Sequence, residues 1–171
     1  MKPLFLVGYM GCGKSTLGRK LAKRLQAKFA DTDALVEERE GASVYDLFYF
    51  AGEAYFRKVE REVLEELIAR EEPMVISTGG GLPTWQENME RMNQVGVTLY
   101  LQRSAEQIAR RLSPYGRYKR PRLRGLEGEE LVAFMAEDMA KREPFYEKAS
   151  LRVDCATMRD EEIVEWLIGR V

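Results

Sequence analysis

The chain has 171 residues, of which 45% are hydrophobic and 32% charged, and this length fits one domain with a sizeable core. The net charge is −1, so no overall field steers the protein toward nucleic acid or a membrane. There is no histidine, and the only cysteines are Cys12 and Cys155. Serine–histidine hydrolysis, histidine metal sites and a disulfide framework are therefore excluded. We expect a cytoplasmic protein, because the early apolar run at 4–7 is too short for a signal or membrane segment.

The predicted elements alternate between strand and helix along the chain. A strand at 4–7 is followed by a glycine-rich turn and then by a helix with an apolar stripe at Leu17, Leu21 and Leu25. Further strands are predicted at 28–30, 74–77, 97–101 and 151–153, and further helices at 43–50, 53–70, 105–112, 127–142 and 160–168. A loop is predicted at 113–125. Pro144 is expected to end the helix predicted at 127–142. This alternation predicts an α/β fold, in which a parallel sheet has helices on both faces and binds ligands at the carboxyl ends of its strands.

The first predicted strand leads into the sequence GYMGCGKS, which matches the phosphate-binding loop G-x-x-x-x-G-K-[ST]. Backbone N–H groups of such a loop point at phosphate oxygens. Lys14 would reach the β- and γ-phosphates, and Ser15 would offer its hydroxyl to Mg²⁺. The residues expected at the nucleotide phosphates are Gly11, Cys12, Gly13, Lys14, Ser15 and Thr16. The alternative is a glycine-rich turn with a solvated lysine, but the motif lies between a buried strand and a helix, as nucleotide binding requires.

Two acidic residues follow the second predicted strand. Asp31 and Asp33 are two positions apart, so on a strand they would face the same side. One carboxylate can hold Mg²⁺ through water, and the other can accept a hydrogen bond from a substrate hydroxyl and orient or deprotonate it. Alternatively, Asp33 caps a helix that begins near Ala34. The spacing leaves both interpretations open.

Two arginines are candidates for binding an anion. Arg57 lies beside the apolar stripe of its helix, where a guanidinium can clamp a carboxylate or phosphate. The alternative for Arg57 is solvation, or pairing with Glu53 or Glu60 on the same helix. Arg142 lies at a helix end, where the helix dipole alone could explain a cation.

Three consecutive glycines, residues 79–81, follow another buried strand. A tight turn needs only one or two glycines, so three in a row indicate that something approaches this backbone closely. We expect these residues to form a wall of a ligand site.

The segment from 110 to 124 carries six arginines, one lysine and no acidic residue. Repulsion within it favours an open, mobile state until an anion arrives. We predict a lid that closes over ATP, delivers an arginine to the transferring phosphoryl group and excludes water. The alternatives are a solvated charge run or an RNA-binding patch, because Tyr115 and Tyr118 interleave with the charges.

In this order, the motifs resemble the shikimate kinase family. The resemblance rests on GYMGCGKST at 8–16, DTD at 31–33, FRKVE at 56–60, GGG at 79–81, RP at 120–121 and REPFY at 142–146. It implies a single domain over 1–171, with a five-stranded parallel sheet in a three-layer α/β/α fold of the nucleoside monophosphate kinase type. It also implies a substrate-binding region at about 33–61 and a mobile lid at about 112–125.

The resemblance implies Mg²⁺-dependent transfer of the ATP γ-phosphoryl group to the 3-hydroxyl of shikimate, in chorismate and aromatic amino-acid biosynthesis. The residues that it makes catalytic are Lys14, Asp33 and Arg120. Those that would bind shikimate are Asp33, Arg57, Gly80 and Arg142, and those that would serve Mg²⁺ are Ser15 and Asp31. Arg120 would reach ATP from the lid and Arg111 would lie near the adenine. We expect a monomer that binds neither nucleic acid nor a membrane.

One departure concerns the lid. The family usually continues its Arg-Pro motif with two leucines, whereas this chain has Arg122 and Leu123. Which of Arg120 and Arg122 contacts phosphate is therefore open, and we take Arg120. The alternative acceptors for a related P-loop kinase are gluconate and a nucleoside monophosphate. Outside enzymes, a nucleotide switch or an RNA-binding P-loop protein is the alternative, although no N-K-x-D base-reading motif of a GTPase is present.

Overall fold

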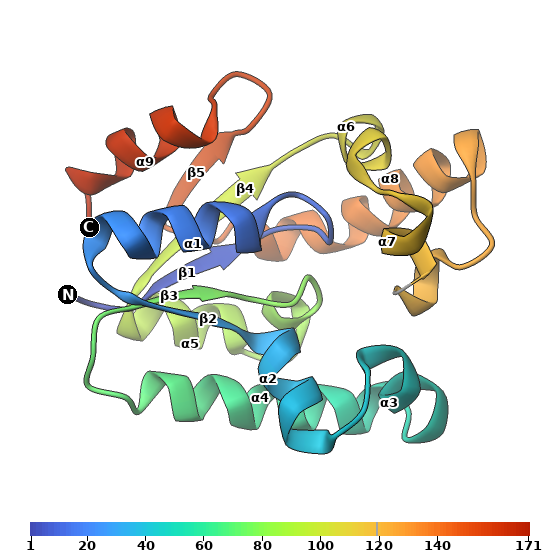
Figure 1. Ribbon diagram of the computed structural model, residues 1–171, viewed down its shortest axis with the longest axis horizontal. Helices are drawn as coiled ribbons and strands as arrows, with labels where there is room; N and C mark the ends of the chain where they lie inside the picture. Colours follow the sequence, from blue (N-terminus) through green and yellow to red (C-terminus); the bar gives the residue numbers. More distant parts are fainter. Residues whose placement is uncertain (119) are drawn as a thin grey trace.

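The computed structural model describes residues 1–118 and 120–171, and a five-stranded parallel sheet runs through them (Figure 1). The strands are β1 (Leu4–Val7), β2 (Lys28–Asp31), β3 (Met74–Ser77), β4 (Val97–Gln102) and β5 (Leu151–Asp154). Their order across the sheet is β2-β3-β1-β4-β5. The predicted parallel sheet is confirmed, and each predicted strand matches an observed one to within a residue at either end.

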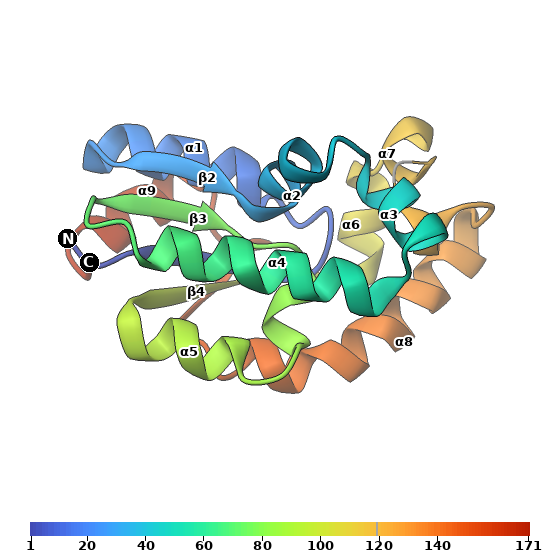
Figure 2. The ribbon, with the colours of Figure 1, turned by 90° about the horizontal axis from the view of Figure 1, so that it is seen from below.

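Helices cover both faces of this sheet. The helices are α1 (Lys14–Leu25), α2 (Thr32–Glu40), α3 (Val44–Phe50), α4 (Glu53–Ile68), α5 (Asn88–Val95), α6 (Ala105–Arg111), α7 (Pro114–Tyr118), α8 (Gly128–Tyr146) and α9 (Asp160–Ile168), with short 3-10 turns η1 (Leu82–Thr84) and η2 (Pro121–Leu123). Helices α1 and α9 lie on one face, and α4, α5 and α8 on the other (Figure 2). The three-layer α/β/α prediction is therefore confirmed. Among the described residues, no helix has both the length and the apolar character needed to cross a membrane.

Strand β1 lies at the centre of the sheet, between β3 and β4, and all four of its side chains are fully buried. This explains why its sequence is a continuous apolar run rather than an alternating one. The registers align the carboxyl ends of three neighbouring strands, because Leu6 of β1 and Asp31 of β2 both pair with Ser77 of β3. The phosphate loop, the two aspartates and the triple glycine are thereby brought to one edge of the sheet.

Two predictions about local structure were wrong. Pro144 does not end α8, which continues to Tyr146. A proline in the last turn removes one backbone hydrogen bond, and the buried Tyr146 ring, 5.3 Å from that of Tyr100, compensates by packing. The segment 113–125 is not a plain loop, because it contains α7 and η2. The hydroxyl of Ser113 accepts a hydrogen bond from the backbone N–H of Gly116 and stabilises α7.

Helix α5 and the turn η1 were not predicted from the sequence. Helix α5 has a short apolar stripe, made by the fully buried Met89 and Met92, within an otherwise polar sequence. Eight residues give too few turns for that stripe to stand out from a loop.

Candidate active site

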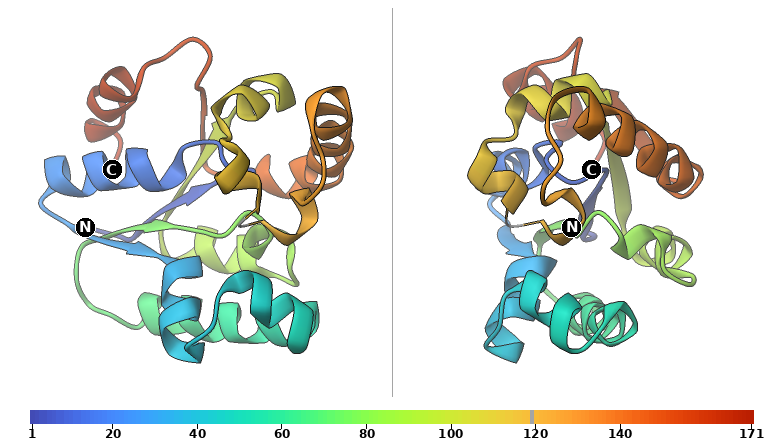
Figure 3. Two further views of the ribbon diagram at one scale, coloured as in Figure 1. Left: turned by 45° about the vertical axis from the view of Figure 1, so that its right-hand side comes forward. Right: turned by 90° about the vertical axis from the view of Figure 1, so that its right-hand side faces the viewer.

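A cavity of about 780 Å³ opens at the carboxyl ends of β1, β2 and β3. Figure 3 shows α7 and η2 across from α2 and α3. Twelve of the thirteen residues that the sequence analysis assigned to the site line this cavity. These are Gly11, Gly13, Lys14, Ser15, Thr16, Asp31, Asp33, Arg57, Gly80, Arg111, Arg120 and Arg142. Cys12 does not line it, because its side chain is only 1% exposed and packs into the core.

The phosphate loop encloses the ammonium group of Lys14. Its Nζ donates hydrogen bonds to the carbonyl oxygens of Gly8, at 2.8 Å, and Tyr9, at 2.9 Å. Gly13, which precedes α1, has φ 101°, a left-handed conformation that favours glycine. A Cβ at Gly13 would lie 3.3 Å from Nη2 of Arg111, so this arginine lies directly over the loop.

Ser15 and Asp31 lie together below the loop. The Ser15 hydroxyl donates a hydrogen bond to Oδ2 of Asp31 at 2.6 Å. The Oγ of Ser77 lies 3.2 Å from the Oγ of Ser15. The other carboxylate oxygen of Asp31 accepts from the backbone N–H groups of Asp33 and Ala34. Asp31, not Asp33, therefore caps α2, and the expected helix start near Ala34 was two residues late. Clustered hard oxygens of this kind fit Mg²⁺.

Asp33 is in the first turn of α2, so the strand argument for its direction was wrong. It nevertheless lines the same cavity as Asp31. Burial, together with the negative charge of Asp31, raises the pKa of Asp33 to about 6, against the opposing charges of Lys14 and Arg57. Burial also lowers the pKa of Arg120, between α7 and η2, and the negative charge of Asp33 acts against that shift. Arg120 and Asp33 thus interact electrostatically across the cavity.

Arg57 is buried and paired with acidic residues of its own helix. Its side chain is 7% exposed, so the solvated alternative was wrong, whereas the alternative of pairing with glutamate is observed. Nη1 lies 2.7 Å from Oε2 of Glu60, and Nη2 lies 3.5 Å from Oε1 of Glu53. Glu60 is 1% exposed, and none of the described residues donates a hydrogen bond to its Oε1. Burial raises the pKa of Glu60 to about 7, although the charge of Arg57 opposes this.

The triple glycine provides space for these charged groups. None of its members has a left-handed φ, so conformation does not require glycine here. A Cβ at Gly79 would lie 2.5 Å from carboxylate oxygens of both Asp33 and Glu60, and one at Gly81 would overlap the guanidinium of Arg57. At Gly80 it would lie 3.3 Å from Nη1 of Arg142. Side chains of the site itself therefore approach this backbone.

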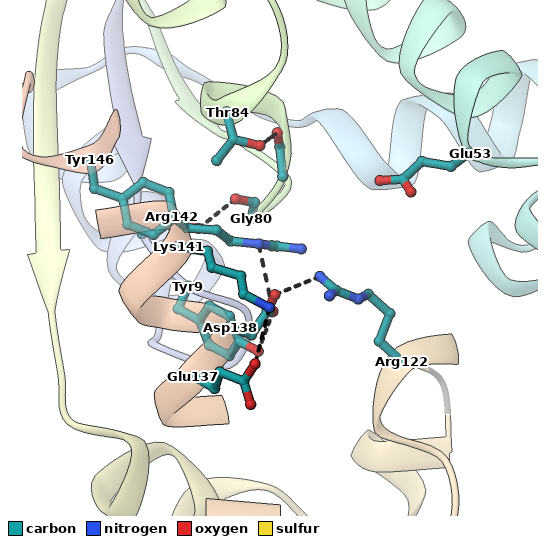
Figure 4. Close-up of polar contacts among 12 residues, drawn as sticks. Tyr9, Glu53, Gly80, Thr84, Arg122, Glu137, Asp138, Lys141, Arg142 and Tyr146 are labelled. Atoms are coloured by element: carbon teal, nitrogen blue, oxygen red, sulfur yellow. Dashed lines mark hydrogen bonds and ion pairs between the residues drawn. The ribbon is translucent and has the colours of Figure 1, made fainter. Parts of the chain in front are cut away.

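Arg142 reaches the cavity from α8, and Figure 4 shows its guanidinium between Gly80 and Asp138. Its Nε is 3.6 Å from Oδ2 of Asp138, one turn earlier in the helix. The hydroxyl of Tyr146 donates to the carbonyl oxygen of Gly80 and ties α8 to the triple glycine. The helix dipole alone does not account for this cation, because it is buried beside the cavity.

Three polar residues near the site, Thr32, Ser77 and Asp138, were not predicted from the sequence, and Glu60 was named only as a possible partner of Arg57. Thr32 is fully buried and accepts a hydrogen bond from the backbone N–H of Gly79 at 2.9 Å. The available signals were helical spacings, since Glu60 lies three residues after Arg57 and Asp138 four residues before Arg142. A smaller cavity of about 370 Å³, which Arg111 also lines, is bounded by residues 155–161, where the sequence analysis assigned nothing.

Comparison with known proteins agrees with this geometry. A family model described as shikimate kinase matches residues 10–171. The chain belongs to the shikimate kinase family. A shikimate kinase from Parabacteroides distasonis is 48% identical over 164 residues, which cover 96% of this chain and 94% of that relative. Membership makes the chain an ATP-dependent kinase, as its motifs predicted.

Solved structures lead to the same family. The crystal structure of shikimate kinase from Bacteroides thetaiotaomicron is 38% identical, has a TM-score of 0.86, and matches over 98% of this chain and 96% of its own. Shikimate kinase from Acinetobacter baumannii in complex with shikimate is 32% identical, with a TM-score of 0.87 over 99% of this chain and 92% of that one. The predicted family and the predicted P-loop kinase fold are both confirmed.

Proposed function

We propose that this chain transfers the γ-phosphoryl group of ATP to the 3-hydroxyl of shikimate, giving shikimate 3-phosphate and ADP for chorismate and aromatic amino-acid biosynthesis. One observation carries the proposal: Asp33, Arg57 and Arg142 face the same cavity as the phosphate loop. Shikimate carries one carboxylate and several hydroxyls, which suits two guanidinium groups beside an aspartate. Membership of the family and the shikimate-bound relative support this acceptor.

At the nucleotide end, the loop N–H groups of residues 11–16 would hold the phosphates, and Arg111 would lie along the adenine. Lys14 would leave its carbonyl partners and bind the β- and γ-phosphate oxygens. Ser15 and Asp31 would hold Mg²⁺, which, when bound, offsets the negative charge of the phosphates. Among the described residues, no three acidic or cysteine side chains form a metal cage, so phosphate oxygens and water would complete the coordination.

At the acceptor end, Arg57 and Arg142 would hold the shikimate carboxylate, and the N–H of Gly80 would contact the substrate. Asp33 would orient the 3-hydroxyl and accept its proton as the phosphoryl group arrives in line. Arg120 would stabilise the charge on the transferring group from the lid, in a site from which water is excluded.

We extend the proposal to the organisation of the chain. Residues 1–171 would act as a single kinase domain, with the substrate-binding region at about 33–61 and a mobile lid at about 112–125. A monomer would suffice, since residues of one chain line the cavity. We propose that it works in the cytoplasm, where ATP is its co-substrate, and that it binds no nucleic acid.

The test is a comparison of acceptors. ADP release is followed with MgATP and, separately, with shikimate, gluconate and a set of nucleoside monophosphates. Turnover with shikimate alone is the expected result. Turnover with another acceptor would support the phosphate loop as an ATP site and reject shikimate as the acceptor. Tight ATP binding without turnover of any acceptor would reject the proposal that the chain is a kinase for these substrates.

A further inference from the structure

Asp138 is shared by two arginines from different parts of the chain. Its Oδ1 lies 2.8 Å from Nη1 of Arg122 on the lid, and its Oδ2 lies 3.6 Å from Nε of Arg142 (Figure 4). Oδ2 also accepts a hydrogen bond from the hydroxyl of Tyr9 at 2.7 Å. Asp138 is 4% exposed, so its charge is compensated by these three groups rather than by water.

Arg122 is the lid residue that departs from the usual pattern of two leucines, and it lines the same cavity as Arg142. Its neighbour Leu123 is fully buried, which anchors this part of the lid against the rest of the molecule. Arg122 itself is 41% exposed and lies over the ring of Phe134 at 5.6 Å. Arg120 has different neighbours, since its Nη1 donates to the carbonyl oxygen of Gly116.

The charges around the acceptor end explain why a second lid arginine matters. Without the lid, the guanidinium group of Arg142 lies against the negative charge of Asp138, and that of Arg57 lies against the carboxyl group of Glu60. Such a site attracts an anionic acceptor weakly. An arginine placed against Asp138 neutralises one of these carboxylates and makes the potential at Arg142 more positive.

We propose that Arg122 and Asp138 are positioning residues for Arg142. The ion pair between Arg122 and Asp138 holds the lid against α8. Asp138 in turn orients Arg142, because its Oδ2 attracts the Nε of that guanidinium. The two terminal nitrogens of Arg142 then remain available for the carboxylate of the acceptor. Lid docking and acceptor binding then strengthen each other through one shared carboxylate. This inference rests on the proposed function, because it takes the acceptor to be a carboxylic acid held by Arg142.

A double-mutant cycle tests the coupling, with Arg122→Leu, Asp138→Asn and both changes together. Arg122→Leu is expected to raise the KM for shikimate about fivefold and the KM for ATP less than twofold, as for a partly exposed ion pair. In the Asp138→Asn background, the same change is expected to alter the KM for shikimate less than twofold. An altered KM for shikimate alone separates positioning from a general loss of folding.

Arg124→Leu is the matched control, because Arg124 lies on the same lid but over the rings of Tyr45, at 3.3 Å, and Tyr118, at 3.8 Å. Its effect on either KM is expected to be the same with and without Asp138→Asn. The proposal is overturned if Arg122→Leu leaves the KM for shikimate unchanged, or changes it equally in both backgrounds.

Hydrogen exchange of the lid amides at 112–125 in the ligand-free protein provides a second measurement that needs no turnover. Arg122→Leu and Asp138→Asn are each expected to speed this exchange severalfold, and the double variant no further. Unchanged exchange in both single variants would reject the ion pair as a lid contact. Failure of the unaltered protein to phosphorylate shikimate would instead reject the proposed function, while this measurement still decides the docking contact.

Discussion

Asp33 and Glu60 lie against the same glycine, since a Cβ at Gly79 would come within 2.5 Å of an oxygen of each carboxylate. They come from different helices, α2 and α4, and converge where the backbone carries no side chain. Two carboxylates in one poorly hydrated space resist ionisation. The pKa of each is raised, mainly by burial, to about 6 for Asp33 and about 7 for Glu60.

The first prediction concerns Asp33 as the base. Because its pKa is raised to about 6, kcat/KM for shikimate should increase as the pH rises through that value and the carboxylate forms. Asp33→Asn should lower kcat by about 10²- to 10⁴-fold and leave ATP affinity nearly unchanged. Initial rates from pH 5 to 8 and nucleotide titration measure both effects. Normal turnover in this variant would remove Asp33 from the mechanism.

The second prediction concerns stability and Glu60. Its pKa is raised on folding, so between its usual value near 4.5 and about 7 the folded protein binds more protons than the unfolded chain. The free energy of unfolding should therefore fall as the pH rises through this range, with a contribution from Glu60 of about 2–3 kcal/mol. Urea denaturation at pH 5 and pH 8 measures it.

Glu60→Gln should flatten this pH dependence, even though it also removes the partner of Arg57 and lowers stability at every pH. Glu62→Gln is the control, because Glu62 lies on the same helix but is half exposed. A pH dependence that is as steep in Glu60→Gln as in the unaltered protein would contradict the assignment of the slope to this residue.

The third prediction concerns the triple glycine. Gly81→Ala would place a methyl group on the guanidinium of Arg57 and displace it. The KM for shikimate should rise about tenfold or more, which corresponds to the loss of one charged hydrogen bond, while the KM for ATP should change little. Gly169→Ala is the control, because no atom lies within 4 Å of a Cβ there. Equal effects of the two changes would show that Arg57 does not depend on the space at Gly81.

The fourth prediction separates the two lid arginines. Arg120→Ala should lower kcat by about a hundredfold or more, because the transferring phosphoryl group loses a cation. Arg122→Ala should keep kcat within about threefold, because its partner is Asp138 rather than phosphate. Single-turnover rates of both variants decide the point. If Arg120→Ala turned over normally and Arg122→Ala did not, the assignment would be reversed.

The sheet edge that forms the site could be predicted because its signals are local. A buried strand followed by glycines or aspartates marks a carboxyl end, and parallel pairing aligns such ends. The direction of the Asp33 side chain was harder to predict, because β2 ends at Asp31 and α2 begins at Thr32. The alternation of side chains along a strand therefore does not extend to Asp33. Both carboxylates still reach the cavity, because the helix starts directly at the strand end.

The glutamate partners of Arg57 were one of the alternatives that the sequence left open, whereas the partner of Arg142 was not predicted. Arg57 has two glutamates within a helical turn, which is equally typical of a solvated helix face. The groups that cover this arginine include the backbone of Gly81, over twenty residues away in the chain, and the rings of Phe48 and Phe56. Likewise, nothing in the sequence relates Arg122 to Asp138, because their pairing depends on how η2 packs against α8.

The placement of Lys14 has a consequence for how nucleotide enters and leaves. Its ammonium group rests against the carbonyl oxygens of Gly8 and Tyr9 and is largely shielded from water. Phosphate binding therefore does not require the removal of a hydration shell from Lys14. The ammonium group would exchange two neutral carbonyl partners for a fully charged anion. After the nucleotide leaves, the same two carbonyl oxygens would accept the ammonium group again, so binding and release would require movement of the Lys14 side chain rather than of the loop backbone.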